Sequence, residues 1–378
     1  MHVHCSSRKK NSRSEPATKT IMSSFLHQRP FQISTSDPHH HQSSPRSVQN
    51  YQNATSAIFS RPAAVLLLLL LLIILGLLFP YIKSPIFFNS NSFETKWRAY
   101  TLRDAAEFVA KNNTLIVCAV SQAYLPFLNN WLISIVHQEQ HDKVLVIAED
   151  YATLYKVNQL WPGHAVLVPP ALEASAAHKF GSQGFFNFTA RRPRHLLQIL
   201  ELGYNVMYND VDMIWLADPF GYMKGEHDVY FTDDMTYVKP WNHSHELPPP
   251  GQKGRTYICS CMIYMRPTSG AKLLMRKWIE EIQAQPWPKT KKANDQPAFN
   301  WALMKTAGKV DMYLLPQSAF PSGGLFFKNE TWSHETMGMH VIIHNNYITG
   351  FEKKIKRFRI YGLWFVDYDA SISPLGSL

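Results

Sequence analysis

The sequence predicts an α/β fold, in which helices flank a mostly parallel sheet, preceded by one transmembrane helix. Three observations predict this class. Beyond residue 97, short apolar runs alternate with segments of helical periodicity, one run is followed directly by two aspartates, and an unbroken apolar segment lies ahead of them all. Apolar strands that alternate with helices are typical of βαβ units, whose parallel sheets are buried on both faces.

The unbroken apolar segment is Ala63–Phe79, and Pro80–Ile82 extend it. Its seventeen residues reach the lower limit for a bilayer span. No polar residue interrupts it, which disfavours a buried core helix. It begins far from the N-terminus and no small-residue cleavage site follows, which disfavours a cleaved signal peptide. We therefore predict a transmembrane signal anchor over residues 63–82.

Residues 1–62 form a polar tail that is rich in Ser, His, Gln and Pro and is predicted to be disordered. The tail carries eight Lys or Arg and two acidic residues. Because a basic flank stays on the cytoplasmic side, we predict a single-pass type II membrane protein whose C-terminal part is lumenal. Much of the net charge of +10 lies in this tail, so we do not expect nucleic acid as a partner. The basic run Lys353–Arg359 is interpreted as a solvated helix face.

The chain beyond the anchor is divided into a short stem, residues 83–97, and a lumenal domain, residues 98–378. Two of the lumenal cysteines, Cys259 and Cys261, are two apart in a predicted strand and share a face, so we expect them to be poorly placed to bond each other. Glycosylation sequons fit the lumenal assignment. They begin at Asn112, Asn187, Asn242 and Asn329.

Within the lumenal domain, apolar runs of strand length predict the sheet and longer periodic segments predict the helices. Pro193 in a first turn and Gly203 as a stop mark one helix. The strands are predicted at Leu115–Val120, Val144–Ala148, Ala165–Val168, Val206–Asp210, Asp228–Thr232, Tyr257–Met265, Asp311–Leu314 and Val341–His344. The helices are predicted at Phe127–Val136, Tyr151–Leu160, Pro193–Leu202, Gly270–Ala284 and Asp295–Met304. Lys179–Phe186 and Pro240–Gly254 are predicted loops, the first a substrate loop and the second a lid or acceptor loop.

Asp210 and Asp212 stand where the predicted strand Val206–Asp210 ends. In a strand, residues two apart point to the same side, so both carboxylates are expected to face one centre. Aspartates next to apolar strands need a partner, and a hard divalent cation is one such partner. A turn with an Asx bond is the alternative. The carboxyl ends of strands are also where open α/β sheets bind ligands.

Three further groups are candidates for the same site. His344 ends a strand and could complete a cation site, which with imidazole would suit Mn²⁺ better than Mg²⁺. Asp295 and Gln296 open a helix, either as ordinary caps or as groups that project toward a sugar. Arg191 and Arg192 precede a helix, where a basic pair opposes the dipole unless an anion binds there.

These residues, in this order, resemble those of retaining glycosyltransferases of GT-A type, and the lumenal part resembles glycosyltransferase family 77. The resemblance covers roughly residues 95–378. It is greatest to a plant branch of the family that transfers xylose from UDP-xylose to L-fucose of pectic rhamnogalacturonan II. The stretches that carry it are Phe127–Trp131, Ile147–Tyr151, Phe185–Pro193, Tyr204–Trp215, Thr256–Met262, Ala293–Asn300 and Ile343–Tyr347.

The resemblance implies a GT-A fold, that is, a Rossmann-like mixed sheet flanked by helices. It implies that Asp210 and Asp212 bind the metal and the donor, with His344 as a third metal ligand. Asp295 and Gln296 would face the donor sugar as catalytic residues, and Arg191 or Arg192 would contact the donor.

For function, the resemblance implies a xylosyltransferase that retains the anomeric configuration and uses UDP-xylose, Mn²⁺ or alternatively Mg²⁺, and a fucose-containing pectic acceptor. It also implies a place in the Golgi membrane. Two alternatives stay open: arabinosyl or galactosyl transfer on the same scaffold, and an inactive carbohydrate-binding relative.

Overall fold

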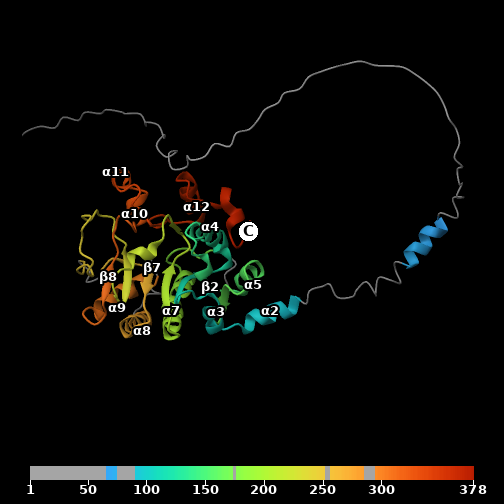
Figure 1. Cartoon of the computed structure of the whole chain (residues 1–378), viewed down its shortest axis with the longest axis horizontal. Helices are drawn as coiled ribbons and strands as arrows, with labels where there is room; N and C mark the ends of the chain where they lie inside the picture. Colours follow the sequence, from blue (N-terminus) through green and yellow to red (C-terminus); the bar gives the residue numbers. More distant parts are fainter. Residues whose placement is uncertain (1–64, 75–89, 173–175, 252–255, 285–293) are drawn as a thin grey trace, which may run out of the picture. The chain divides into compact units, whose positions relative to one another are not determined.

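The computed structural model describes residues 65–74, 90–172, 176–251, 256–284 and 294–378 (Figure 1). The chain divides into two compact units, Met1–Phe87 and Phe88–Leu378. In the first unit, residues 65–74 form a helix with exposed side chains. Among the described residues, no helix is both long and apolar enough to cross a membrane. The predicted tail, residues 1–62, and the remainder of the predicted anchor lie outside the described residues.

The second unit is built on a seven-stranded sheet with the strand order β3-β2-β1-β4-β7-β6-β8. β7 pairs antiparallel with β4 and β6, and all other pairings are parallel, so six strands run one way and one runs against them. The predicted mixed sheet is therefore confirmed. The strands are β1 (Thr114–Val120), β2 (Val144–Ala148), β3 (Ala165–Leu167), β4 (Asn205–Asn209), β6 (Val229–Asp233), β7 (Ile258–Met265) and β8 (Met312–Leu314).

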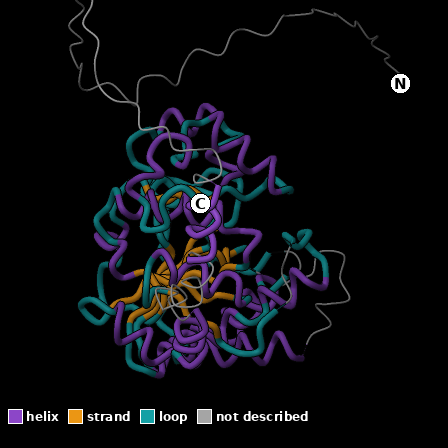
Figure 2. Tube along the Cα trace, turned by 90° about the vertical axis from the view of Figure 1, so that its right-hand side faces the viewer, coloured by secondary structure: helices purple, strands orange, loops and turns teal. Residues whose placement is uncertain are grey.

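Helices cover both faces of this sheet (Figures 1 and 2). Every predicted helix is present, as α4 (Leu125–Val136), α5 (Tyr151–Leu160), α7 (Arg192–Glu201), α8 (Ser269–Ala284) and α9 (Gln296–Thr306). The sequence analysis did not identify α2 (Ser90–Ala99), α3 (Leu102–Val109), α6 (Gln183–Thr189), α10 (Gly323–Phe326), α11 (Glu330–Glu335), α12 (Phe351–Ile360) and α13 (Val366–Asp369). Part of the predicted stem is thus helical, and Trp97 of α2 is buried.

Alternate residues of each central strand enter two separate cores. In β1, Ile116 and Cys118 pack with α4, α5 and α12, whereas Leu115 and Val117 pack with α3, α7, α8 and α9. Successive side chains of a strand point to opposite faces, so a run that is apolar throughout needs cover on both. This requirement explains why the strands read as continuous apolar segments.

A separate two-stranded sheet joins β5 (Met213–Trp215) to β9 (Ile342–His344). The pairing is antiparallel and places Met213 opposite His344. Just outside the pair, Asn345 donates its backbone N–H to the carbonyl of Asp212 at 2.9 Å. The segment that follows β9 is thereby fixed beside the turn that follows β4.

The expectation that Cys259 and Cys261 are poorly placed to bond each other is wrong, because the structure joins them in a disulfide. Where Asp233 pairs with Ile258, the register of β7 against β6 shifts and β7 carries extra residues. A bulge bends its strand and shortens the distance between residues that a regular strand holds apart. The two Cα atoms are 5.2 Å apart, within the range that disulfides use.

The close approach of α10 to β9 makes Gly323 a sensitive position. A Cβ atom added at Gly323 would lie 2.5 Å from the carbonyl oxygen of Asn346 and 2.6 Å from that of His344. We expect Gly323→Ala to lower the free energy of unfolding by about 1–3 kcal/mol, because backbone has to move to admit the methyl group. The measurement is chemical denaturation of the full chain.

The matched control is Gly221→Ala, since a Cβ atom at the exposed Gly221 would meet nothing within 4 Å. Equal unfolding free energies for the two variants would show that the approach of α10 to β9 is not tight.

Candidate active site

The aspartate pair lies in the turn between β4 and β5 rather than on a strand. β4 ends at Asn209, one residue before the predicted end. The buried amide of Asn209 anchors the turn, because its Oδ1 accepts a hydrogen bond from Trp215 Nε1 at 2.7 Å. The carboxylates of Asp210 and Asp212 nevertheless face one centre, although the alternation of a regular strand is not the reason.

His344 joins this pair through the β5–β9 pairing. Ligand atoms of Asp210, Asp212 and His344 all lie within 4.8 Å of one another. His344 Nε2 is 3.4 Å from Asp212 Oδ1. Two carboxylates and one imidazole on a partly open surface are a donor set that suits Mn²⁺, and the oxygen ligands also suit Mg²⁺. The residues present therefore fit the divalent cation that the sequence predicts.

Lys354 of α12 was not identified as a site residue, and the interpretation of Lys353–Arg359 as a solvated face is wrong in part. The Lys354 ammonium pairs with the second carboxylate oxygen of Asp212. Arg357 is buried and donates from Nε to Asn345 Oδ1 at 2.6 Å. Only one side of α12 is solvated, because residues three apart on a helix share a face.

The charges around Asp212 keep it ionised. Burial opposes ionisation, but Lys354 and His344 outweigh it and hold the pKa of Asp212 well below its usual range. Without a bound cation, the Lys354 ammonium supplies the positive charge that this carboxylate requires.

Arg192 links the aspartate pair to α9. The Arg192 guanidinium is buried and contacts Asp210 Oδ1 at 3.0 Å and Asp295 Oδ2 at 3.3 Å. It also donates to the carbonyl oxygen of Ser260 at 2.7 Å and lies over the ring of Tyr208. Burial raises the pKa of Asp210, and Arg192 opposes that rise. A basic side chain at the start of a helix needs an anion beside it, and for Arg192 the anions are carboxylates of the chain itself.

Arg191 pairs with a different carboxylate, that of Glu149. Its Nη1 lies 2.8 Å from Glu149 Oε2 and donates to the carbonyl oxygen of Pro170 at 2.8 Å. Glu149 is buried at the end of β2, and His195 Nε2 lies 3.5 Å from its other oxygen. Arg191 therefore connects the start of α7 to the edge of β2, whereas Arg192 is the arginine in contact with Asp210.

Asp295 and Gln296 lie at different depths. Asp295 is 2% exposed, and its carboxylate makes no capping bond to α9. Burial raises the pKa of Asp295 to about 6 against the opposing effect of Arg192. Gln296 is half-buried and donates from Nε2 to Asp234 Oδ2 at 2.8 Å. Gln296 is therefore the more accessible of the two.

Asp234 is a further polar group of this site that the sequence analysis did not identify. Its Oδ1 accepts a hydrogen bond from Asn346 Nδ2 at 2.7 Å, so it connects α9 to the segment after β9. Asp234 directly follows β6, as Asp210 follows β4. The rule that selected Asp210, a carboxylate after an apolar strand, also applies to Asp234 and would have identified it.

The predicted sequons stand on the surface of the described domain to different degrees. Asn112, Asn187 and Asn242 are exposed, whereas Asn329 is half-buried and caps α11 by accepting from Trp332 N–H at 3.1 Å. The prediction of a loop at Lys179–Phe186 is wrong at its end, because Gln183–Phe186 belong to α6, which Ser182 caps. The other predicted loop, Pro240–Gly254, extends beyond the described residues.

Comparisons with known proteins agree with this geometry. The family model for nucleotide-diphospho-sugar transferases matches residues 139–358. The UDP-D-xylose:L-fucose alpha-1,3-D-xylosyltransferase MGP4 of Arabidopsis thaliana is 67% identical over 357 residues, covering 94% of this chain and 98% of that protein. The UDP-D-xylose:L-fucose alpha-1,3-D-xylosyltransferase 1 of Arabidopsis thaliana is 64% identical, covering 89% and 96%.

Among solved structures, the galactosyltransferase LgtC in complex with donor and acceptor sugar analogs covers 65% of this chain and 95% of its own, at 12% identity and a TM-score of 0.38. This likeness is too low to carry an argument.

The loss of the buried Arg192 side chain is expected to lower the stability of the fold. We expect Arg192→Met to lower the free energy of unfolding by about 3–5 kcal/mol, because it leaves the buried Asp295 and the partly buried Asp210 without their shared partner. Chemical denaturation at neutral pH measures the loss. Arg194→Met, at an exposed position of the same helix, is the matched control and should change stability by less than about 0.5 kcal/mol. Similar losses in both variants would contradict the assigned role of Arg192.

Proposed function

We propose that this chain, which belongs to the nucleotide-diphospho-sugar transferase family, transfers xylose from UDP-xylose to an L-fucose residue in α-1,3 linkage. The observation that carries the proposal is the similarity over nearly the whole chain to enzymes named for that reaction. The geometry supports it, because the carboxylates of the site gather at one sheet edge.

Asp210, Asp212 and His344 would hold the cation, with Mn²⁺ as the first candidate and Mg²⁺ as the alternative. When bound, such a cation supplies Lewis-acid stabilisation of the charge that builds on the leaving diphosphate. Lys354 adds a second positive charge beside Asp212. Its flexible stem would let the ammonium turn from Asp212 toward a bound phosphate once the carboxylate has another partner.

Gln296 and Asp234 are half-buried polar groups on the α9 side of the site. They offer an amide and a carboxylate to sugar hydroxyls. Asp295 lies behind them against Arg192, with only 3% of its side chain exposed. This burial favours a stabilising role for Asp295, which would hold Arg192 and through it Asp210, over direct attack on the anomeric carbon. Retention of configuration would then depend on attack from the face of the leaving group.

The proposed acceptor is a fucose-containing residue of pectic rhamnogalacturonan II, and the proposed location is the Golgi membrane. The basic tail before the apolar segment supports a type II orientation, with residues 98–378 in the lumen. Asn112, Asn187 and Asn242 are exposed and so accessible to glycosylation.

The donor and the acceptor can be tested together. The full chain is incubated with UDP-xylose, UDP-arabinose or UDP-galactose and an L-fucoside, in the presence of Mn²⁺. We expect a xylosylated fucoside whose α-1,3 linkage nuclear magnetic resonance identifies. Preference for another donor would replace the proposed substrate, and no turnover of any donor would favour the inactive carbohydrate-binding alternative.

Cation dependence is expected to follow the aspartate pair. Asp212→Asn should lower kcat by about 10²–10³, because the leaving charge loses electrostatic stabilisation, and chelation should lower the wild-type rate similarly. Asp142→Asn, at an exposed carboxylate away from this site, should leave the rate unchanged. An Asp212→Asn enzyme that turns over at the wild-type rate under chelation would remove the cation from the proposal.

The raised pKa of Asp295 predicts an acid limb in the pH profile. Asp295 becomes protonated as the pH falls through about 6 and then no longer pairs with Arg192 as a carboxylate. We therefore expect kcat/KM to fall over the same pH range. Since the folded pKa lies above the ordinary 3.8, ionisation of Asp295 also costs stability as the pH rises from about 4 to about 6. In Asp295→Asn, both the limb and this part of the stability profile should disappear. If the variant keeps a limb near pH 6, another group is responsible.

A further inference from the structure

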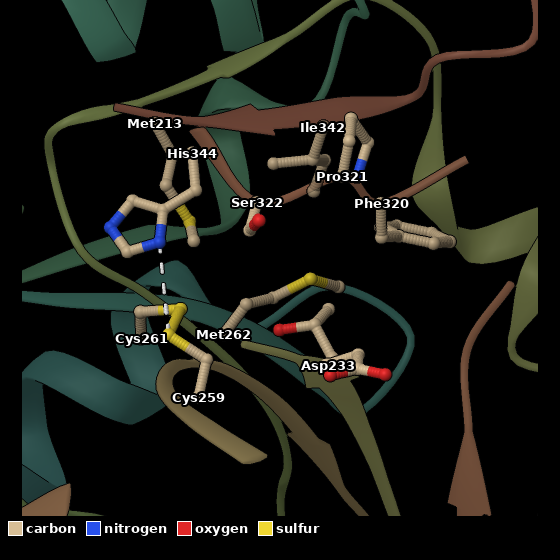
Figure 3. A pocket seen from close by; sticks show the side chains of 11 residues that line it. Met213, Asp233, Cys259, Cys261, Met262, Phe320, Pro321, Ser322, Ile342 and His344 are labelled. Carbon is tan, nitrogen blue, oxygen red and sulfur yellow. Dashed lines mark hydrogen bonds between the residues drawn. A yellow bond between two sulfur atoms is a disulfide. The ribbon is translucent and has the colours of Figure 1, made fainter. Parts of the chain in front are cut away.

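A second set of metal-ligating atoms lies on the opposite side of the His344 ring from the aspartates. Cys259 Sγ is 3.7 Å from His344 Nδ1, and ligand atoms of Cys259, Cys261 and His344 lie within 4.8 Å of one another. All three side chains are buried, and they line one pocket together with Met213 and Met262 (Figure 3). Four sulfur atoms and an imidazole nitrogen surround this pocket, so its chemistry is soft where that of the aspartate pair is hard.

The spacing suits zinc once the sulfur–sulfur bond is open. In a tetrahedral site with Zn–S about 2.3 Å and Zn–N about 2.1 Å, a sulfur and a nitrogen ligand stand about 3.6 Å apart. The Cys259–His344 distance of 3.7 Å already matches. The two unbonded sulfurs, on positions two apart in the β7 bulge, can separate to the required distance. Two thiolates and an imidazole leave one position of the tetrahedron for water.

Opening the bond requires two electrons. A dithiol reductant supplies them: its two thiols become a disulfide, and its two protons and two electrons convert the bond between Cys259 and Cys261 into two thiols. Zinc binding then releases a proton from each thiol, because the thiolate is the ligand.

His344 cannot serve both sites at once. A neutral imidazole has one nitrogen that donates and one that accepts. To bind a cation beside Asp212 through Nε2, His344 must carry its proton on Nδ1, where the Cys259 sulfur is its neighbour. To bind zinc through Nδ1, it must carry its proton on Nε2. The state of the two cysteines therefore determines which side of the ring binds a metal.

We propose that Cys259, Cys261 and His344 form a zinc site when the disulfide is reduced, and that zinc there withdraws His344 from the cation site of the aspartate pair. The second half rests on the proposed function, whereas zinc binding itself does not. The backbone couples the two sites as well, because Asp210 donates its N–H to the carbonyl of Cys261 at 2.8 Å.

Cobalt reports on the site directly, since thiolate ligation of Co²⁺ gives charge-transfer bands in the near ultraviolet that carboxylate and imidazole ligands do not give. The full chain is prepared oxidised and reduced, and thiols are counted after denaturation. The reduced chain should show four thiols and the oxidised chain two, because the disulfide takes two of the four cysteines. We expect one thiolate-bound Co²⁺ per chain after reduction, displaced by Zn²⁺, and none before it.

Cys259→Ser and Cys261→Ser should lose the bands, whereas Cys118→Ala, at the buried free cysteine, should keep them. If the serine variants fail to fold, the cobalt spectra of the oxidised and reduced wild-type chains still test the proposal. A reduced chain without thiolate–cobalt bands overturns the proposal.

Activity gives the second readout. Reduced enzyme with one equivalent of Zn²⁺ should lose most of its Mn²⁺-supported transfer, and the oxidised enzyme should not. Zinc bound with full transfer retained would overturn the withdrawal of His344. If no preparation transfers sugar, the proposed function fails, while the cobalt result stands by itself.

Discussion

The arrangement of the site depends on the buried guanidinium of Arg192. It lies between Asp210, which follows β4, and Asp295, which opens α9, and it also holds the Ser260 carbonyl of β7. Buried carboxylates are costly unless they are paired, so the guanidinium offsets the cost of bringing these three segments together. Lys354 of α12 supplies a similar positive charge for Asp212, although it lies far from Asp212 in the sequence. Two cationic side chains of the protein thus pair with three carboxylates, and the ligand atoms of the proposed cation site already lie close together.

Topology explains how residues far apart in the sequence meet there. The parallel strands bring their carboxyl ends to one edge, and β7, which runs against them, brings its amino end to that edge with Cys259 and Ser260. The β5–β9 pair then places His344 beside Asp212. The same pair directs Nδ1 of the His344 ring toward the β7 bulge, while Nε2 lies beside Asp212. A hard and a soft set of ligand atoms therefore share one histidine.

The strands of the large sheet, the main helices and the residues of the proposed cation site could be predicted from the sequence, since each depends on local pattern, whereas the short strand β5 was not predicted. Apolar runs identify the strands, and Asp210, Asp212 and His344 stand where such runs end. Long-range pairing has no such local signal. Nothing near Lys354 indicates that its ammonium reaches Asp212, and its basic neighbours suggest a solvated face. The disulfide was excluded because a regular strand separates Cys259 from Cys261, and only the register of β6 against β7 reveals the bulge.

The central claim is that Asp210, Asp212 and His344 form one cation site in which the Lys354 ammonium holds the place of the metal charge. Electron paramagnetic resonance of free Mn²⁺, titrated with the nucleotide-free chain, tests it most directly. The account predicts one Mn²⁺ per chain, bound more tightly by Lys354→Met than by the wild type, because the ammonium no longer competes for Asp212. The same affinity in both, or a weaker one in Lys354→Met, would contradict it.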